Sequence, residues 1–346
     1  MNSDKTIQIQ FMTEKVVGHG EDAPPLLVVK EQGCAIGVFD GMGGAGASTC
    51  QSDYGENQTK AYVASRIIKN EIESYLNNQQ AEWNISAEGM KDIIVKRLKQ
   101  EKDNYPPAKK SMLKSKLVRE YPTTMALVTI QEKENNWKID SYWAGDSRCY
   151  LWTKDGFYQI SKDDLIGDGD PMENLNNDAP MSNCICADRD FSINHLEIVI
   201  PKNPVIIMCA TDGCFGYYPT PMHLEQLLRS KLKESKNIDE WKEKIIEDIQ
   251  QVTGDDSSLA LVGLGFNKFE NIDYGLLNSS FLNNSFFIST FLQKTCRHIN
   301  NLKELISFKN KSKKRNKKQM VSEPMTWDDY KKVYMKYINV EDHANA

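Results

Sequence analysis

Acidic residues stand at the ends of four apolar runs in this sequence. They are Glu21 and Asp22, Asp40, Asp212, and the adjacent pair Asp255 and Asp256. Each lies just before or just after a run such as CAIGVF or VIIMCA, which has the composition of a buried strand. A carboxylate at the end of a buried strand needs a partner, and no Lys or Arg occurs within ten residues after Asp40.

These carboxylates have the composition of a divalent metal site. The ends of neighbouring strands meet at one edge of a sheet, so the four groups could converge there. Converging carboxylates repel one another unless cations lie between them, and oxygen donors suit Mg²⁺ or Mn²⁺. Gly41, directly after Asp40, allows a close approach of its own carbonyl group. A single Asp-Gly pair is more often a turn, whereas three sites together with an acidic pair favour the metal site.

A further aspartate, Asp146, lies in the short segment GDSR (145–148) between two strand-like runs. Taken alone, this segment is a plausible hairpin turn. If the two flanking runs are strands of the same structure, the turn places Asp146 at an edge as well. Asp146 is therefore a further candidate metal ligand.

The composition excludes several classes of protein. The chain has 346 residues, a formal net charge of −5 and eight cysteines. The charge gives no reason to expect nucleic acid as a partner, and no apolar run is long enough to span a membrane. The first ten residues lack the pattern of a secretion signal, and the scattered cysteines suit reduced core positions. We therefore expect a cytoplasmic protein.

The order of the expected elements predicts an α+β fold. Strands are predicted at 6–12, 26–30, 34–39, 123–130, 136–144, 148–152, 195–200, 204–210 and 258–266. Helices are predicted within 55–76, at 87–101 and 108–119, and over 221–252. The three strands between 123 and 152 are expected to form a meander. Strands and helices occur in blocks, which favours a largely antiparallel sheet packed against helices.

The composition changes near residue 267. Residues 1–266 are predicted to form one domain, and 267–346 a C-terminal extension that begins with an Asn-, Ser- and Phe-rich segment. Residues 309–318 hold seven basic residues and are expected to be a solvated linker. Residues 326–338 predict a short amphipathic helix, with Thr326 as its N-cap. That helix would dock either on the domain or on a partner.

Six short motifs in a fixed order resemble the metal-dependent serine/threonine protein phosphatases of the PPM, or protein phosphatase type 2C, family. The motifs are GED (20–22), VFDGMGG (38–44), YPTTMALV (121–128), AGDSRCYLW (144–152), ATDGCFGY (210–217) and GDDSSLALV (254–262). Met42 within DGMGG resembles the bacterial branch of the family. The resemblance covers roughly residues 6–266. It implies a β-sandwich of two antiparallel sheets flanked by α-helices, with a binuclear Mg²⁺ or Mn²⁺ centre at one edge.

The resemblance also implies a role for each matched residue. Asp40 would bridge two metal ions, with Gly41 contributing its carbonyl oxygen. Asp212 and Asp255 would bind the first ion, and Glu21 and Asp22 would hold water on the second. Asp146, together with Asp212, would match a third and weaker metal position, and Asp256 stands where the family usually has Asn. The implied activity, which belongs to signalling, is hydrolysis of phosphoserine and phosphothreonine by a metal-bridging water.

One position departs from the family pattern. The family usually carries an Arg for the substrate phosphate where this chain has Val17, which removes a bidentate contact. Lys15 and Arg148 are candidate replacements, and His19 is a candidate proton donor, although an ordinary loop histidine is the simpler interpretation. The expected partner is a phosphorylated protein, either a kinase or its target. The alternatives are a catalytically weak module that binds phosphoproteins or regulates a partner, and an enzyme for small phosphate esters.

Overall fold

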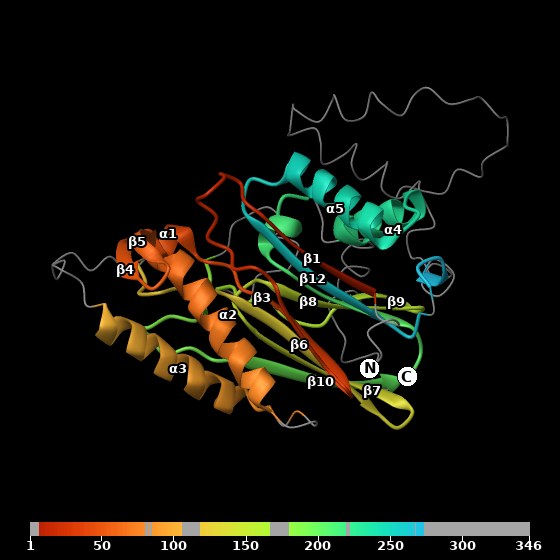
Figure 1. Ribbon diagram of the computed structural model, residues 1–346, viewed down its shortest axis with the longest axis horizontal. Coiled ribbons are helices and arrows are strands. Elements are labelled where there is room, and N and C mark those ends of the chain that lie inside the picture. Colours follow the sequence, from red (N-terminus) through yellow and green to blue (C-terminus); the bar gives the residue numbers. More distant parts are fainter. Residues whose placement is uncertain are drawn as a thin grey trace. The chain divides into compact units, whose positions relative to one another are not determined.

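Two five-stranded antiparallel sheets carry helices on their outer faces (Figure 1). The computed structural model describes residues 7–79, 83, 85–105, 118–166, 180–218, 222–266 and 268–272. The first sheet has the strand order β1-β12-β11-β8-β9, and the second has the order β10-β7-β6-β3-β2. This architecture confirms the predicted α+β sandwich.

The bounds of the elements agree closely with the apolar runs of the sequence. The first sheet contains β1 (Ile7–Thr13), β12 (Ser257–Leu264), β11 (Val205–Ala210), β8 (Arg148–Thr153) and β9 (Gly156–Gln159). The second contains β10 (Asn194–Pro201), β7 (Asn136–Ala144), β6 (Met125–Lys133), β3 (Gly33–Val38) and β2 (Leu26–Lys30). A separate hairpin joins β4 (Thr49–Ser52) to β5 (Gly55–Thr59). The helices are α1 (Gly43–Gly46), α2 (Lys60–Asn78), α3 (Ala87–Asn104), α4 (Met222–Glu234) and α5 (Ile238–Val252), with a short 3-10 helix, η2 (Asp212–Cys214).

The main core lies between the two sheets. Ile36 and Val38 of β3 share it with Ile207 of β11 and Val262 of β12, and all four side chains are buried. The opposite face of the second sheet packs against α2 and α3, where Ile68 is fully buried. β3 is buried at all six positions because both of its faces are covered. Burial on both faces explains why its sequence is continuously apolar rather than alternating.

Helices α4 and α5 pack on the outer face of the first sheet (Figure 1). The Arg229 guanidinium of α4 lies over the Trp152 ring of β8, 4.8 Å from its centroid. The fully buried Trp241 of α5 donates from its indole nitrogen to the Leu228 carbonyl oxygen of α4 (3.1 Å). The fold therefore has four layers, with two helices outside each sheet.

The expected meander between residues 123 and 152 is wrong at its second connection. β6 and β7 form a hairpin in the second sheet, but β8 pairs with β11 and β9 in the first. The chain therefore crosses between the sheets at 145–147. Gly145 has a φ of +99°, and a Cβ there would lie 2.7 Å from the Thr124 side chain. Only glycine suits both constraints, and the hydroxyls of Thr124 and Ser147 meet beside it at 2.6 Å.

Three further expectations are corrected. The helix expected within 55–76 begins at Lys60, because 55–59 pairs with 49–52 as a hairpin. The helical stretch 221–252 is two helices, and Asn237 caps the second by accepting from the Glu240 backbone amide (2.8 Å). The short strand β9 has no counterpart in the predictions. Residues 106–117, 309–318 and 326–338 lie outside the described part of the chain, so the helices and linker expected there stay predictions.

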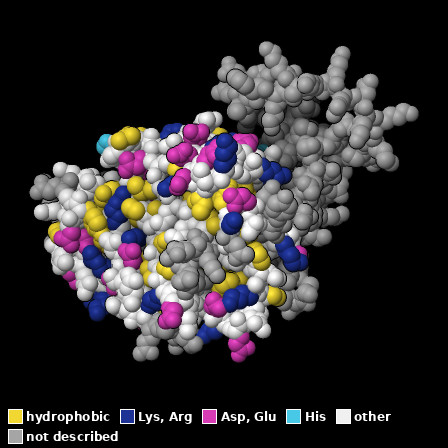
Figure 2. Space-filling view, turned by 45° about the vertical axis from the view of Figure 1, so that its right-hand side comes forward, with side chains coloured by type: hydrophobic (Ala, Val, Ile, Leu, Met, Phe, Trp, Pro, Cys, Tyr) yellow, Lys and Arg dark blue, Asp and Glu magenta, His cyan; other side chains and the backbone are white. Residues whose placement is uncertain are grey.

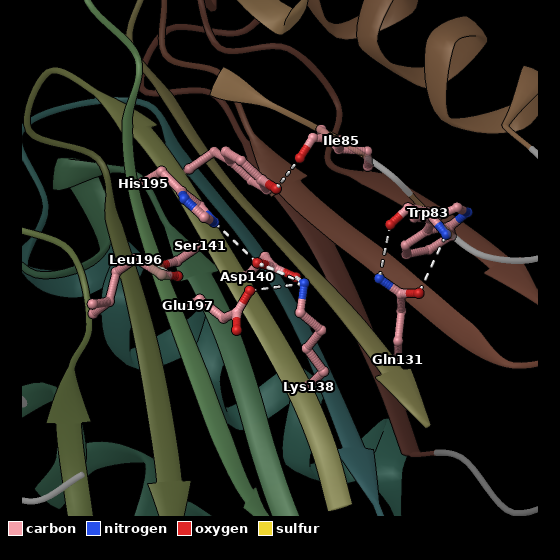
Figure 3. A network of polar contacts seen from close by, with 10 residues as sticks. Trp83, Ile85, Gln131, Lys138, Asp140, Ser141, His195, Leu196 and Glu197 are labelled. Atoms are coloured by element: carbon pink, nitrogen blue, oxygen red, sulfur yellow. Dashed lines mark hydrogen bonds and ion pairs between the residues drawn. The ribbon is translucent and has the colours of Figure 1, made fainter. Parts of the chain in front are cut away.

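A polar network lies on the face of the second sheet that the helices only partly cover (Figure 3). The buried Asp140 accepts from Lys138 (3.1 Å) and contacts the His195 ring nitrogen (3.0 Å). Gln131 exchanges two hydrogen bonds with the Trp83 backbone (3.2 and 3.1 Å). The buried Asp140 carboxylate thus has hydrogen-bond partners. Gln131 separately fixes the backbone of Trp83, which lies between α2 and α3 in the sequence.

Charged side chains of both signs are distributed over the described surface shown in Figure 2. In the part of the chain that the structure describes, none of the helices is long and apolar enough to cross a membrane.

Truncation of the inter-sheet core is expected to destabilise the protein strongly. Ile207→Ala removes a fully buried side chain and should lower the free energy of unfolding by about 2–5 kcal/mol. Urea denaturation followed by fluorescence measures this change. Val199→Ala is the control, since Val199 is 56% exposed and should change stability by less than about 0.5 kcal/mol. Equal effects of the two substitutions would contradict the assigned core.

Candidate metal centre

The five aspartates expected to form the site lie close enough to influence one another. Burial raises the pKa of Asp40 well above its usual range, and the charges of Asp22, Asp212, Asp146 and Asp255 raise it further. Asp40 follows β3 in the second sheet, whereas Asp212 follows β11 in the first. The side chains of these two residues interact, since each affects the pKa of the other. The candidate site therefore spans the edge where both sheets end.

Burial is the main cause of the perturbed pKa values in this cluster. Burial and the Asp212 charge raise the pKa of Asp146 to about 7. The same two effects raise the pKa of Asp22 to about 7, against the lowering effect of hydrogen bonds from Ser258 and Thr211. Burial and the Asp255 charge raise the pKa of Asp212 to about 6. Without cations, these groups resist ionisation near neutral pH.

The backbone at Asp40 is fixed by the start of β6. The Thr123 hydroxyl donates to the Asp40 carbonyl oxygen (2.6 Å), and the Thr124 amide donates to the same oxygen (2.9 Å). Gly41 also pairs with Thr123. A Cβ at Gly41 would lie 2.5 Å from the Glu21 carbonyl oxygen, so glycine permits the close packing of the two acidic segments.

Asp22 is the most buried acidic residue of the candidate site. It is 2% exposed and accepts from the Thr211 hydroxyl (3.0 Å). Thr211 precedes Asp212, so this bond joins the acidic pair to the end of β11. The Thr211 and Ser258 hydroxyls are polar partners that the sequence interpretation did not identify.

Glu21 is held at its backbone and at its side chain. Its carbonyl oxygen accepts from the Ser65 hydroxyl (2.6 Å), and its carboxylate accepts from the Thr59 hydroxyl (2.5 Å). Its amide donates to the Asp256 carboxylate (2.7 Å). The carboxylate also lies against Gly43, where a Cβ would be 1.7 Å from Oε2. The glycines after Asp40 thus leave room for Glu21.

Asp256 and Lys15 join the loop before Glu21 to the segment before β12. The second oxygen of the Asp256 carboxylate accepts from the Lys15 amide (2.8 Å), and the Lys15 ammonium donates to the Thr253 carbonyl oxygen (2.7 Å). Asp256 therefore anchors the Glu21 loop through two backbone amides. The charge of Lys15 is directed to a main-chain carbonyl.

Asp146 and Arg148 lie on the crossing segment between the sheets. The Oδ1 atom of Asp146 is buried without a hydrogen-bond partner in the described part of the chain. The Arg148 guanidinium forms a bidentate pair with Asp163 (2.9 and 2.6 Å) and lies over the Phe215 ring. The one basic side chain of GDSR is thus already bound to a carboxylate.

The loop that contains Val17 is open to solvent. Val17 is 90% exposed, and His19 is also exposed. The His19 amide donates to the Val16 carbonyl oxygen in a tight turn (2.9 Å). His19, Lys15 and Arg148 therefore stay predictions as substrate-contacting residues.

Three solved bacterial structures have the same architecture. A bacterial serine phosphatase aligns with a TM-score of 0.54 at 16% identity, covering 75% of this chain and 98% of its own. The Mycobacterium tuberculosis serine/threonine phosphatase PstP/Ppp aligns at 0.53 with 14% identity, covering 75% and 99%. Stp1 from Staphylococcus aureus aligns at 0.53 with 16% identity, covering 74% and 94%. Comparison with family models and with curated proteins gave no match.

This chain has the PPM phosphatase fold. The PPM sandwich covers about three quarters of the chain and nearly the whole of each similar structure. At 14–16% identity the likeness establishes the fold alone.

The residues at this edge of the PPM sandwich fit a divalent metal. All the side-chain donors are carboxylate oxygens, and one of them, Oδ1 of Asp146, is a buried acceptor without a donor in the described part of the chain. Among the described residues, no three His, Cys, Asp or Glu side chains form a complete coordination group. The donor chemistry is nevertheless that of Mg²⁺ or Mn²⁺, and the Asp40 and Asp212 side chains are close enough to affect each other's pKa.

Gly43→Ala is expected to displace the Glu21 carboxylate without unfolding the protein. The clash is with the end of a flexible side chain, so Glu21 can move and the backbone can stay. We expect about tenfold weaker Mn²⁺ binding, the size typical of changes beside a ligand. Isothermal titration calorimetry measures it. Gly44→Ala is the matched control, since a Cβ there meets nothing within 4 Å; equal affinities for the two variants would contradict a role for Glu21.

Without metal, the protein should be more stable at pH 5 than at pH 8. The pKa values of Asp22, Asp146 and Asp212 rise on folding to about 7, 7 and 6. At a pH between the ordinary aspartate pKa and these raised values, the folded state keeps protons that the unfolded chain has released. The free energy of unfolding therefore falls as the pH rises through this range. Urea denaturation of EDTA-treated protein measures the slope, and Asp146→Asn should make it shallower. A stability that rises from pH 5 to pH 8 would rule out this account.

Proposed function

We propose that this protein is a metal-dependent serine/threonine protein phosphatase. The observation that supports it best is the convergence of carboxylates from five chain segments at the edge of a PPM sandwich. The similar bacterial structures are serine or serine/threonine phosphatases. Fold and site thus support the same activity, although each alone would support only a broad class.

The proposed ligand set follows the matched motifs. Asp40 would serve both Mg²⁺ or Mn²⁺ ions, and Gly41 would contribute its carbonyl oxygen. Asp212 and Asp255 would hold the first ion, and Glu21 and Asp22 would hold water on the second. Asp146 would serve a third position with Asp212. The unpartnered buried oxygen of Asp146 supports this last assignment.

The ions would supply an activated water as nucleophile and would offset charge on the phosphoryl oxygens. The residues of this chain orient that centre. Thr123 and Thr124 fix the backbone of Asp40, and Thr211 fixes the side chain of Asp22. These contacts hold the carboxylates in place before a metal binds, which limits the rearrangement that binding requires.

The substrate we propose is a phosphorylated side chain of a protein. The loop that contains Val17 is exposed, and this residue provides no charge. Arg148 and Lys15 have protein partners, so contact with the phosphate would fall mainly to the metal ions. We expect a high KM for small phosphate esters as a result.

The remaining assignments are part of the same proposal. We place the catalytic unit in residues 1–266, with 267–346 as an extension that docks a partner. We also propose that the protein acts in cytoplasmic signalling on a kinase or on a kinase target.

The purified full-length protein is expected to hydrolyse p-nitrophenyl phosphate and a phosphothreonine peptide when Mn²⁺ is added. EDTA should abolish the reaction, and Asp40→Asn should reduce kcat at least a hundredfold, since Asp40 would contact both ions. Asp190→Asn is the control, because Asp190 is an exposed partner of Lys91 and should leave turnover unchanged. Release of inorganic phosphate measures all four cases.

Two other outcomes would change the proposal. Tight Mn²⁺ binding without turnover would favour the phosphoprotein-binding module, a reading that the missing arginine at Val17 supports. Rapid hydrolysis of metabolite phosphates, with none of the peptide, would favour a small phosphate ester as substrate.

A further inference from the structure

Helix α2 carries three residues that contact the Glu21 segment. Thr59, the N-cap of α2, donates to the Glu21 carboxylate while its hydroxyl accepts from the Tyr62 amide (3.1 Å). Ser65 donates to the Glu21 carbonyl oxygen (2.6 Å). Arg66 donates to the same carbonyl oxygen (3.3 Å). The acidic pair is therefore attached to one face of this helix.

Arg66 is unusual among these residues because it is a buried cation bound to carbonyl oxygens. It is 9% exposed. One terminal nitrogen lies 3.3 Å from the Glu21 oxygen, 3.2 Å from the Tyr62 carbonyl oxygen and 3.4 Å from the Ser65 hydroxyl oxygen, and the other lies 3.4 Å from the Gly20 carbonyl oxygen. The guanidinium also lies over the Tyr62 ring, 3.3 Å from its centroid. None of the ion pairs in the described part of the chain includes Arg66.

Arg66 is one of three residues whose side chains hydrogen-bond to the Glu21 backbone on both sides of its Cα. Asp256 accepts from the amide on one side of the residue, and Ser65 and Arg66 donate to the carbonyl on the other. Arg66 extends this hold to Gly20, at the end of the exposed loop that contains Val17. The planar fork of a guanidinium can reach two successive carbonyls at once, which an ammonium cannot.

We propose that Arg66 is a positioning residue for the acidic pair Glu21–Asp22, and that it sets the geometry in which this pair serves the second metal ion. The proposal rests on the phosphatase function proposed above. It differs from a charge effect, since a cation near a metal site repels the metal, and removing a purely repulsive cation would tighten metal binding. It also differs from a role in folding alone, which would leave the metal affinity of the folded protein unchanged.

The test is calorimetric titration of Mn²⁺ into the EDTA-treated full-length protein. Arg66→Met should weaken one of the two binding events about tenfold and leave the other within about threefold. Arg66→Lys should fall between Arg66→Met and the wild type, because an ammonium can still donate to one of the two carbonyl oxygens but cannot reach both. Ser65→Ala removes only the hydroxyl that donates to the Glu21 carbonyl oxygen, and it should weaken the same binding event. This variant replaces Arg66→Met in the test if Arg66→Met does not fold.

Arg229→Lys is the matched control. Arg229 is also buried, but it pairs with Glu225 on α4 (2.7 Å), so both Mn²⁺ affinities should stay at the wild-type values. Urea denaturation of each metal-free variant shows whether a loss of affinity follows merely from a loss of stability. The positioning role is supported if Arg66→Lys weakens one of the two Mn²⁺-binding events while Arg229→Lys binds both ions like the wild type. The comparison requires that the two variants have similar stability.

The outcomes separate this inference from the proposed function. If the wild type neither binds Mn²⁺ nor hydrolyses phosphate, the proposed function fails and the inference fails with it. If the wild type does both and the Arg66 and Ser65 variants bind both ions as tightly, the inference alone is overturned. Tighter binding by Arg66→Met would also overturn it, because Arg66 would then act through repulsion.

Discussion

Repulsion between buried carboxylates is the constraint on which the rest of this structure depends. Asp22, Asp40, Asp146 and Asp212 influence one another at the edge of the sandwich beside the exposed Asp255, and burial of the first four removes the water that would screen their charges. Such a cluster costs stability unless something offsets its charge. The surrounding hydroxyls and amides hold individual groups, but they carry no positive charge. A pair of divalent cations has the matching charge and donor preference.

The sandwich creates this cluster by ending strands of two sheets at one place. β3 and β11 lie in different sheets, yet Asp40 and Asp212, each two residues after its strand, are close enough to affect each other's pKa. The segment that crosses from β7 to β8 brings Asp146 to the same edge. A single sheet with a meander would place Asp146 in an ordinary turn, so the crossing gives this residue its candidate role.

The basic side chains described near the candidate site bind carboxylate or carbonyl groups of the protein itself. Arg148 is bound to Asp163, Lys15 to the Thr253 carbonyl, and Arg66 to the carbonyls of Gly20 and Glu21. Each fixes a segment that carries an acidic residue. With Val17 in place of an arginine, the candidate site holds its carboxylates through these contacts. In the proposed phosphatase, recognition of the substrate would therefore depend mainly on the metal ions.

The sequence by itself determined most strands and the acidic residues at their ends, because apolar runs and Asp-Gly steps are local patterns. Asp212 and Asp255 lie near enough to Asp40 for their charges to raise its pKa, and their role as metal ligands stays a prediction. Only the tertiary structure decided which sheet each strand joins, so β8 was misplaced and the hairpin β4–β5 was missed. It also decided that Thr59, Ser65, Arg66 and Thr211 serve the acidic pair. No local pattern marks those four residues, since their partners lie about 40 to 190 positions away and meet them only when the chain is folded.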